Sequence, residues 1–245
     1  MKTIQKDTQK EIGQYVAEDY RTASVFSKYG VDFCCKGDRT LEDVCNKKAI
    51  KIDAILHDLD IVMTQKGEEH IDFKSWPLDL LIDYIEKKHH RYVESKSPVL
   101  IQYLEKLCKV HGHANPELYK IFDEFKKASG ELALHMKKEE LVLFPFIKKL
   151  VKAHDFNTPI DLPHFGTAQN PISMMKEEHD IEGERFRLIA ELSNNYQPPA
   201  HACNTYKVAY NMLNDFEKDL HKHIHLENNI LFPKALSLEA KVFSY

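Results

Sequence analysis

The apolar positions of the chain recur at steps of three and four residues over long stretches with few turn signals, a pattern that predicts amphipathic α-helices. Four long helices are predicted, at residues 77–109, 117–152, 171–194 and 200–236. Shorter apolar patterns ahead of them indicate a small helical unit at residues 1–65, and 66–76 read as a linker. We therefore expect an all-α protein in which residues 77–238 form an up-down four-helix bundle.

The second and fourth predicted helices carry the same motif, H-x-x-x-E-x-x-x-L-F-P. Its histidine and glutamate are His135 and Glu139 in one copy and His223 and Glu227 in the other. Residues four apart on a helix differ by about 40° in direction, so each copy presents an imidazole and a carboxylate on one face. Flanking apolar residues make this the buried face, where a carboxylate is costly unless an opposite charge meets it. A metal site shared by the two helices would supply that charge, whereas the alternative is two unrelated surface His–Glu pairs.

The four predicted helices form two pairs, and the second helix of each pair carries the motif. A metal site built from two equal halves also needs a ligand from the first helix of each pair. On the third helix, His179 lies on the apolar stripe. On the first helix, the stripe leads to the pair His89-His90. Ideal periodicity counted from Ile85 favours His89, which is about 40° from it, but the residues alone leave the choice open.

Four imidazoles and two carboxylates suit iron, manganese or zinc. The two glutamates come from different helices, so they could bridge two metal ions that each hold two imidazoles. Ferritin-like di-iron bundles use Glu-x-x-His and more carboxylates, so the order here is different. Three nearby acids, Glu131, Glu178 and Asp219, are candidates for orienting the imidazoles or giving the metal access, with a solvated helix face as the alternative.

Composition narrows the class of protein. A net charge of −4 argues against a nucleic-acid or anionic-membrane partner. The first ten residues are polar, unlike a secretory signal, and no apolar run approaches the roughly 20 residues of a membrane span. Five cysteines, an odd number, then favour free thiols in a reducing compartment. We expect a cytoplasmic protein.

Cys34 and Cys35 are adjacent in the predicted N-terminal unit. Adjacent thiols are poorly placed to hold one tetrahedral ion, so they indicate redox chemistry or transient capture of iron, unless they are structural. The role of Cys45 is open, and Cys108 and Cys203 are expected to pack at helix ends.

Residues 77–236 resemble a hemerythrin-like di-iron domain. The run Asp32-Phe-Cys-Cys35 with Gly37 resembles the ScdA-type N-terminal domain of the iron–sulfur cluster repair proteins, the RIC family that includes YtfE and ScdA. The run Leu226-Glu-Asn-Asn229 is also similar to that family, and the resemblance covers nearly the whole chain.

The resemblance implies two iron ions per chain with oxo and carboxylate bridges. The implied ligands are His90, His135, Glu139, His179, His223 and Glu227. In the family the first ligand is the second residue of a Tyr-His pair. Here that pair is His89-His90, so position 89 departs from the pattern, and His90 remains the favoured ligand.

The implied function is repair of iron–sulfur clusters damaged by oxidative or nitrosative stress, with the protein donating iron and Cys34 and Cys35 as the catalytic thiols. The alternatives are a hemerythrin-type carrier or sensor of oxygen or nitric oxide, and a di-iron nitric oxide reductase or oxidase. The expected partners are damaged iron–sulfur proteins, with nitric oxide or oxygen as small ligands. The small N-terminal unit needs its neighbour or a second copy, as in a homodimer, to bury a core.

Overall fold

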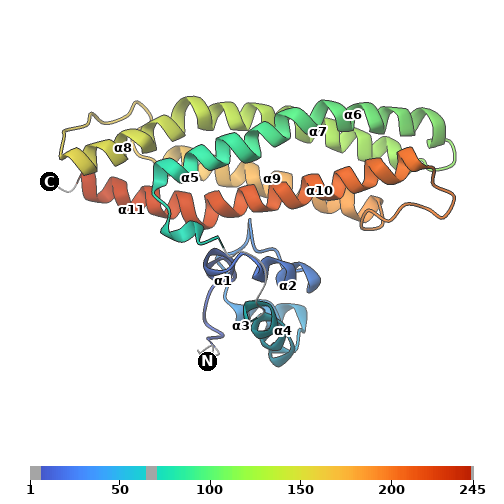
Figure 1. Cartoon of the computed structure of the whole chain (residues 1–245), viewed down its shortest axis with the longest axis horizontal. Helices are drawn as coiled ribbons and strands as arrows, with labels where there is room; N and C mark the ends of the chain where they lie inside the picture. Colours follow the sequence, from blue (N-terminus) through green and yellow to red (C-terminus); the bar gives the residue numbers. More distant parts are fainter. Residues whose placement is uncertain (1–6, 65–70, 244–245) are drawn as a thin grey trace. The chain divides into compact units, whose positions relative to one another are not determined.

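The computed structural model describes residues 7–64 and 71–243, so part of the predicted linker lies outside the described residues. The all-α prediction is confirmed: helices account for the regular structure of the described residues, beside an isolated antiparallel bridge between Glu11 and Thr40 (Figure 1). Along this part of the chain, no helix combines the length and apolar character that crossing a membrane requires. The chain forms two compact units.

The first unit comprises residues 1–77 together with Ile224–Lys234. Its N-terminal helices are α1 (Ile12–Glu18), α2 (Thr22–Lys28), α3 (Leu41–Lys48), α4 (Ile52–Thr64) and the 3₁₀ helix η1 (Phe73–Ser75). The side chain of Thr40 caps α3 by accepting a hydrogen bond of 3.1 Å from the backbone N–H of Asp43. Phe26, Leu41 and Ile55 are fully buried in the small core of this unit.

The second unit comprises residues 78–223 and 235–245. The helical elements from residue 78 onward are α5 (Leu78–Tyr84), η2 (Ile85–His90), α6 (Arg91–His111), α7 (Glu117–Lys138), η3 (Glu139–Leu143), α8 (Phe144–Phe156), α9 (Gln169–Leu192), α10 (Asn204–Leu226), η4 (Glu227–Leu231) and α11 (Phe232–Val242). They run as four long rods, formed by α5–α6, α7–α8, α9 and α10–α11, with α7 packed on α6 and α9 (Figure 1). The last rod supplies the segment that belongs to the first unit, a division that the sequence did not predict.

Three phenylalanines hold the middle of the bundle together. The rings of Phe186 on α9 and Phe216 on α10 stack with centroids 5.7 Å apart. Phe125 on α7 meets both edge-on, at 6.4 and 5.1 Å. All three are fully buried, so this cluster fixes three rods around one core.

Three of the rods are interrupted by π-helical turns, η2, η3 and η4, where the hydrogen bond spans five residues instead of four. In η3 the N–H of Phe144 bonds the carbonyl of Glu139, and in η4 that of Phe232 bonds the carbonyl of Glu227. A proline follows each phenylalanine and has no N–H to continue the α-helical pattern, which favours the wider turn. Each π-turn contains a predicted metal ligand.

Candidate metal centre

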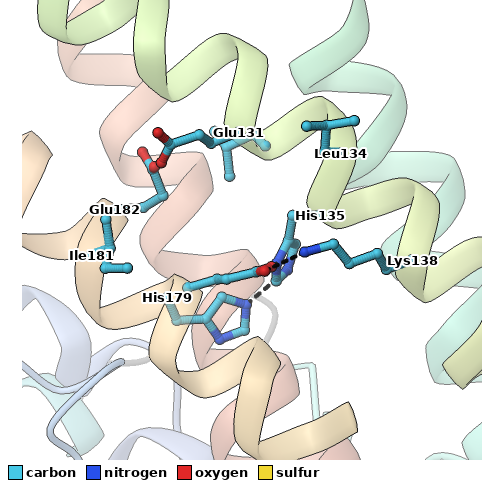
Figure 2. A pocket seen from close by; sticks show the side chains of 9 residues that line it. Glu131, Leu134, His135, Lys138, His179, Ile181 and Glu182 are labelled. Carbon is cyan, nitrogen blue, oxygen red and sulfur yellow. Dashed lines mark hydrogen bonds and ion pairs between the residues drawn. The ribbon is translucent and has the colours of Figure 1, made fainter.

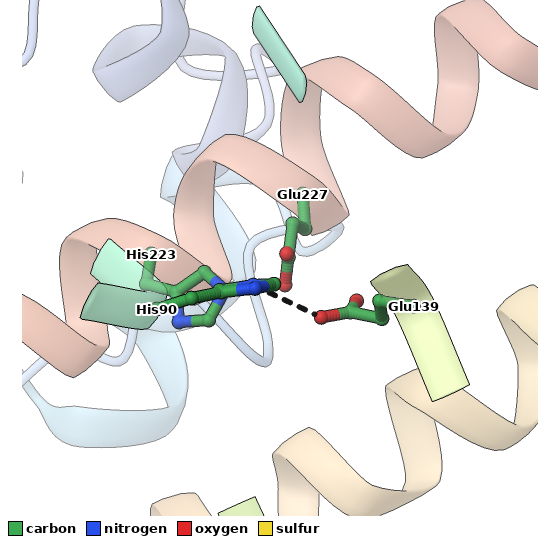
Figure 3. A group of neighbouring side chains, drawn as sticks. All are labelled: His90, Glu139, His223 and Glu227. Carbon is green, nitrogen blue, oxygen red and sulfur yellow. Dashed lines mark ion pairs between the residues drawn. The ribbon is translucent and has the colours of Figure 1, made fainter. Parts of the chain in front are cut away.

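The structure brings the six predicted ligands together in two overlapping groups. One group consists of His90, Glu139, His223 and Glu227, and the other of His135, Glu139, His179 and Glu227. Within each group the ligand atoms lie within 4.8 Å of one another, and all six side chains are buried. Figure 3 shows the imidazoles of the first group beside the two carboxylates. Both groups contain both glutamates, so the carboxylates lie where they could bridge two ions.

Glu139 contacts histidines of both groups. Its Oε2 is 3.3 Å from Nε2 of His90 and 3.5 Å from Nε2 of His135. The Nε2 atoms of His135 and His179 are 3.1 Å apart. The fully buried carboxylates of Glu139 and Glu227 carry charge that is expensive to keep out of water without a cation. Buried imidazoles and carboxylates in this proportion fit iron, as they fit other ions of intermediate softness.

Two further glutamates fix the orientation of predicted ligand imidazoles. Nδ1 of His135 donates to Oε2 of Glu178 at 2.7 Å, which leaves Nε2 facing the centre. That hydrogen bond, together with the ion pair to Lys138, outweighs burial and lowers the pKa of Glu178 to about 2. Nδ1 of His90 is likewise 3.0 Å from Oε1 of Glu140. Glu140 was not predicted from the sequence, although it adjoins the predicted ligand Glu139 just as Glu178 adjoins His179.

The other two acids singled out from the sequence have different neighbours. Asp219 lies 3.1 Å from Nδ1 of His89, so it meets the histidine outside the two groups. Glu131 pairs with Arg185 at 2.8 Å. The π-turn η2 accounts for the placement of His90 with the two groups, because it brings back toward the face of Ile85 a residue that an ideal α-helix would turn away by about 140°.

A cavity of about 240 Å³ opens beside the second group of ligands. Its walls include His135 and His179 at one end, with Glu131, Glu182 and Ile181 farther along, as Figure 2 shows. Burial raises the pKa of Glu182 to about 7, because the nearby Arg185 only partly offsets the cost of a buried charge. The two groups can therefore be approached from the α7–α9 side, between acidic and apolar side chains.

The first unit holds the two adjacent cysteines as free thiols. Their sulfur atoms are 3.8 Å apart, and Oδ1 of Asp32 is 3.4 Å from Sγ of Cys34. The same oxygen accepts the backbone N–H groups of Cys34 and Cys35 at 3.1 and 3.0 Å. The hydrogen bond with Cys35, followed by burial, raises the pKa of the Cys34 thiol well above its usual value. Asp32 thus joins the thiols as a third potential ligand, which was not predicted from the sequence.

The residues after Glu227 hold this cysteine loop. The side-chain amide of Asn228 donates to the carbonyl of Cys34, and that of Asn229 to the carbonyl of Phe33, both at 3.2 Å. Two glycines permit this approach, because a Cβ at Gly13 would lie 2.4 Å from Oδ1 of Asn229 and one at Gly37 would lie 2.5 Å from the Phe33 carbonyl. All these residues belong to the first compact unit.

Comparisons with known proteins agree with this architecture. Residues 81–235 match the hemerythrin HHE cation binding domain, and residues 8–62 match ScdA_N, described as a domain of unknown function (DUF542). The chain is 36% identical over 229 residues to the iron-sulfur cluster repair protein YtfE of Escherichia coli O81 (strain ED1a), which covers 93% of this chain and 97% of the relative. It is 35% identical over 216 residues to YtfE of Yersinia pestis (strain Pestoides F), which covers 88% and 91%. The chain therefore belongs to the family of the YtfE iron–sulfur cluster repair proteins, with a hemerythrin-like cation-binding domain.

Proposed function

We propose that this chain binds two iron ions and uses them to restore damaged iron–sulfur clusters. His90 and His223 would hold one ion and His135 and His179 the other, with Glu139 and Glu227 bridging. The observation that carries the proposal is the pair of four-residue groups that share both glutamates. Each ion would have four protein ligands, which leaves coordination positions for small molecules.

Bound iron supplies Lewis-acid and one-electron chemistry, and the chain supplies the surroundings. Glu178 and Glu140 accept the outer N–H groups of His135 and His90, so each imidazole keeps its Nε2 toward the centre. Burial of all six ligands limits the access of bulk water. The cavity beside His135 and His179 gives small molecules and ions a defined approach.

The function as a repair protein rests on the family. The relatives are named iron-sulfur cluster repair proteins and align along nearly the whole chain. Iron is then cargo, which the protein donates to damaged iron–sulfur proteins in the cytoplasm. Bridging carboxylates favour this role because a carboxylate can change its mode of coordination as an ion leaves.

The cysteine loop would take part in the transfer. Asp32, Cys34 and Cys35 offer one carboxylate and two sulfur ligands within 4.8 Å of one another. Thiolates are the ligands that iron–sulfur clusters use, so a soft transient site suits a hand-off between the protein and a cluster. The Cys34 thiol, whose pKa is raised, would lose its proton when iron arrives, since a coordinating thiol is deprotonated by the ion.

The deciding experiment mixes the purified protein with an enzyme whose iron–sulfur cluster has been damaged by nitric oxide. Iron-loaded protein should restore activity, and the same preparation stripped of iron should not. Free ferrous iron at the same concentration is the control for simple release into solution. Equal recovery with free iron would contradict donation by the protein, and metal analysis that finds one ion per chain would contradict the bridged pair.

A further inference from the structure

A histidine and a cysteine meet at the end of the bundle where α6 ends and α10 begins. Nε2 of His111 lies 3.3 Å from Sγ of Cys203, although the two residues are far apart in sequence. His111 is the last residue of α6, and Cys203 directly precedes α10. The axis of α10 from there to His223 is about 30 Å long at 1.5 Å per residue, so this pair is separate from the metal ligands.

The imidazole of His111 is held in place by its neighbours. Its ring lies against that of Tyr206, with centroids 5.5 Å apart. The next residue is Gly112, where a Cβ would come within 2.6 Å of the Tyr119 ring, so the turn after α6 is closely packed. Cys203 itself is exposed, in contrast to the expectation that it fills space at a helix end. An accessible thiol thus faces a fixed base.

Two features of the geometry suit attack by the sulfur of Cys203. An imidazole at hydrogen-bond distance can take the thiol proton, and the resulting imidazolium stabilises the sulfur anion. Cys203 is also the N-terminal cap of α10, because its carbonyl accepts the hydrogen bond of Lys207 at 3.1 Å. The positive end of a helix dipole stabilises an anion at this position. By contrast, Cys108 one turn before His111 is buried, and burial raises its pKa.

Three lysines lie in the two segments that meet at the pair, and one acid, Glu117 at the start of α7, lies just beyond the first segment and near Tyr206. Residues 106–116 and 192–214, the two segments that meet here, contain no aspartate or glutamate. They carry lysines, and Lys106 and Lys207 lie within one or two turns of the pair in sequence. Lys109 is the exception, because it is paired with Glu105 at 2.8 Å. A small anionic reagent would be attracted to this thiol more than a cationic one.

We propose that Cys203, with His111 as its base, exchanges with a small anionic disulfide of the glutathione type. The Cys203 proton passes to Nε2 of His111, and the thiolate attacks one sulfur of the disulfide. That S–S bond breaks as the bond to Cys203 forms, and the departing thiolate takes the proton back from the imidazolium. One disulfide and one thiol are consumed and one of each is produced, so the step needs no further oxidant.

The test follows the Cys203 peptide by mass spectrometry after iron-loaded full-length protein is mixed with oxidised glutathione at pH 7. Cys203 should form the mixed disulfide about tenfold faster than a synthetic peptide of residues 202–207, which contains no histidine and lacks the rest of the helix. His111→Gln should slow the reaction by a similar factor. His113→Gln, which removes an exposed histidine two residues along, is the matched control and should react like the native protein.

Several results would overturn the proposal. A native rate no faster than that of the peptide would show that the fold does not activate Cys203, and this comparison stands even if His111→Gln fails to fold. Equal rates in folded His111→Gln and native protein, with helical content checked by circular dichroism, would exclude His111 as the base. Alkylation by iodoacetamide without mixed-disulfide formation would exclude the disulfide as the reagent. Iron content is measured in parallel, so a failure here is distinguishable from a failure of the proposed iron site.

Discussion

Glu139 and Glu227 are the residues on which the proposed centre depends most, because each belongs to both groups of ligands. Loss of an imidazole that belongs to one group would weaken the binding of one ion. Loss of a shared carboxylate would remove one bond to each of the two ions and half of the negative charge that compensates them. Their complete burial also means that the carboxylates cannot be replaced by solvent without rearrangement.

We therefore predict that Glu139→Gln and Glu227→Gln each lower the iron content from about two per chain to well below one. Plasma mass spectrometry on protein purified from iron-supplied cells measures this. Glu177→Gln, an exposed glutamate beside Glu178, is the control and should keep the native content. Native iron content in both variants would contradict bridging by these carboxylates.

The neighbouring histidines His89 and His90 give a sharper test. His90 lies with the ligand groups, while His89 faces Asp219 and stacks on His223 with ring centroids 5.7 Å apart. His90→Ala should therefore reduce the iron content strongly, and His89→Ala should reduce it by less than half. The visible absorption of the loaded protein gives an independent readout. A response to His89→Ala alone would show that ideal helical periodicity, not the π-turn, identifies the ligand.

At the scale of single residues, the sequence was most informative where the His-x-x-x-Glu pattern occurs twice. The recurrence of His135 with Glu139 and of His223 with Glu227 was sufficient to predict two inward-facing pairs. It was not sufficient to choose between His89 and His90, because the hydrogen-bond pattern of η2 changes the helical phase by one residue. The roles of Glu140 and Asp32 were not predicted, because their contacts with His90 and with the Cys34 thiol depend on the folded backbone.

Among the elements, the long helices were predicted closely but their interruptions were not. The predicted helix at 117–152 is observed as α7, η3 and α8, and that at 200–236 as α10, η4 and α11. Periodicity alone does not reveal a π-turn, since the positions Leu132, His135, Glu139, Leu143 and Phe146 keep steps of three and four residues through η3. The prolines after Phe144 and Phe232 were the available signal, because a proline within an apolar helical stripe removes a backbone donor.

Helices α7 and α9 are joined by a cluster of one cation and three carboxylates. Arg185 on α9 bonds Glu124 at 2.9 Å and Glu131 at 2.8 Å, both on α7, and Glu182 at 3.2 Å on its own helix. Glu182 is only 3% exposed, and burial raises its pKa from 4.5 to about 7. The folded protein therefore binds a proton more tightly at this site than the unfolded chain does.

This makes a prediction about pH. The contribution of Glu182 to stability is fully present below about pH 4.5 and is lost as the pH rises through 7, since the charged form is disfavoured in the folded state. A glutamine cannot ionise, so Glu182→Gln should remove that loss. Between pH 5 and pH 8 the variant should lose less unfolding free energy than the native protein does, by on the order of 2 kcal/mol. Urea unfolding of metal-free protein at the two pH values measures it. The exposed Glu191→Gln on the same helix is the control, and an unchanged pH dependence would refute the assignment.

For the whole molecule, the question is whether the cysteine loop is needed to build the metal centre or only to use it. The bonds from Asn228 and Asn229 go to backbone carbonyls of Cys34 and Phe33, not to sulfur. Removal of the thiols should therefore leave the loop and the neighbouring metal ligand in place. The sequence predicted two separate sites joined by a linker, and in the structure Ile224–Lys234 belongs to the same compact unit as residues 1–77.

We predict that Cys34→Ser combined with Cys35→Ser keeps the protein folded and loaded with iron but lowers its repair of a damaged cluster enzyme several-fold, because the soft ligands for transfer are gone. Iron content, circular dichroism and recovered enzyme activity are compared on one preparation. Cys203→Ser serves as the matched control for loss of a thiol and should repair normally. Full repair by the double variant would rule out the thiol hand-off, and loss of iron would show that sulfur itself supports the centre.

The two asparagines that follow Glu227 have a further thermodynamic consequence. They attach the backbone beside a proposed metal ligand to the backbone that presents the two thiols, so the order of one segment depends on the order of the other. Linkage requires the effect to be mutual: if an iron ion on Glu227 stabilises the loop by some factor, then a molecule that pulls the loop away weakens the hold on iron by the same factor. A damaged iron–sulfur protein that binds Cys34 and Cys35 would thereby weaken the binding of iron at the moment when that protein can accept the iron. The protein would keep its iron while idle and release it on contact, with no separate signal.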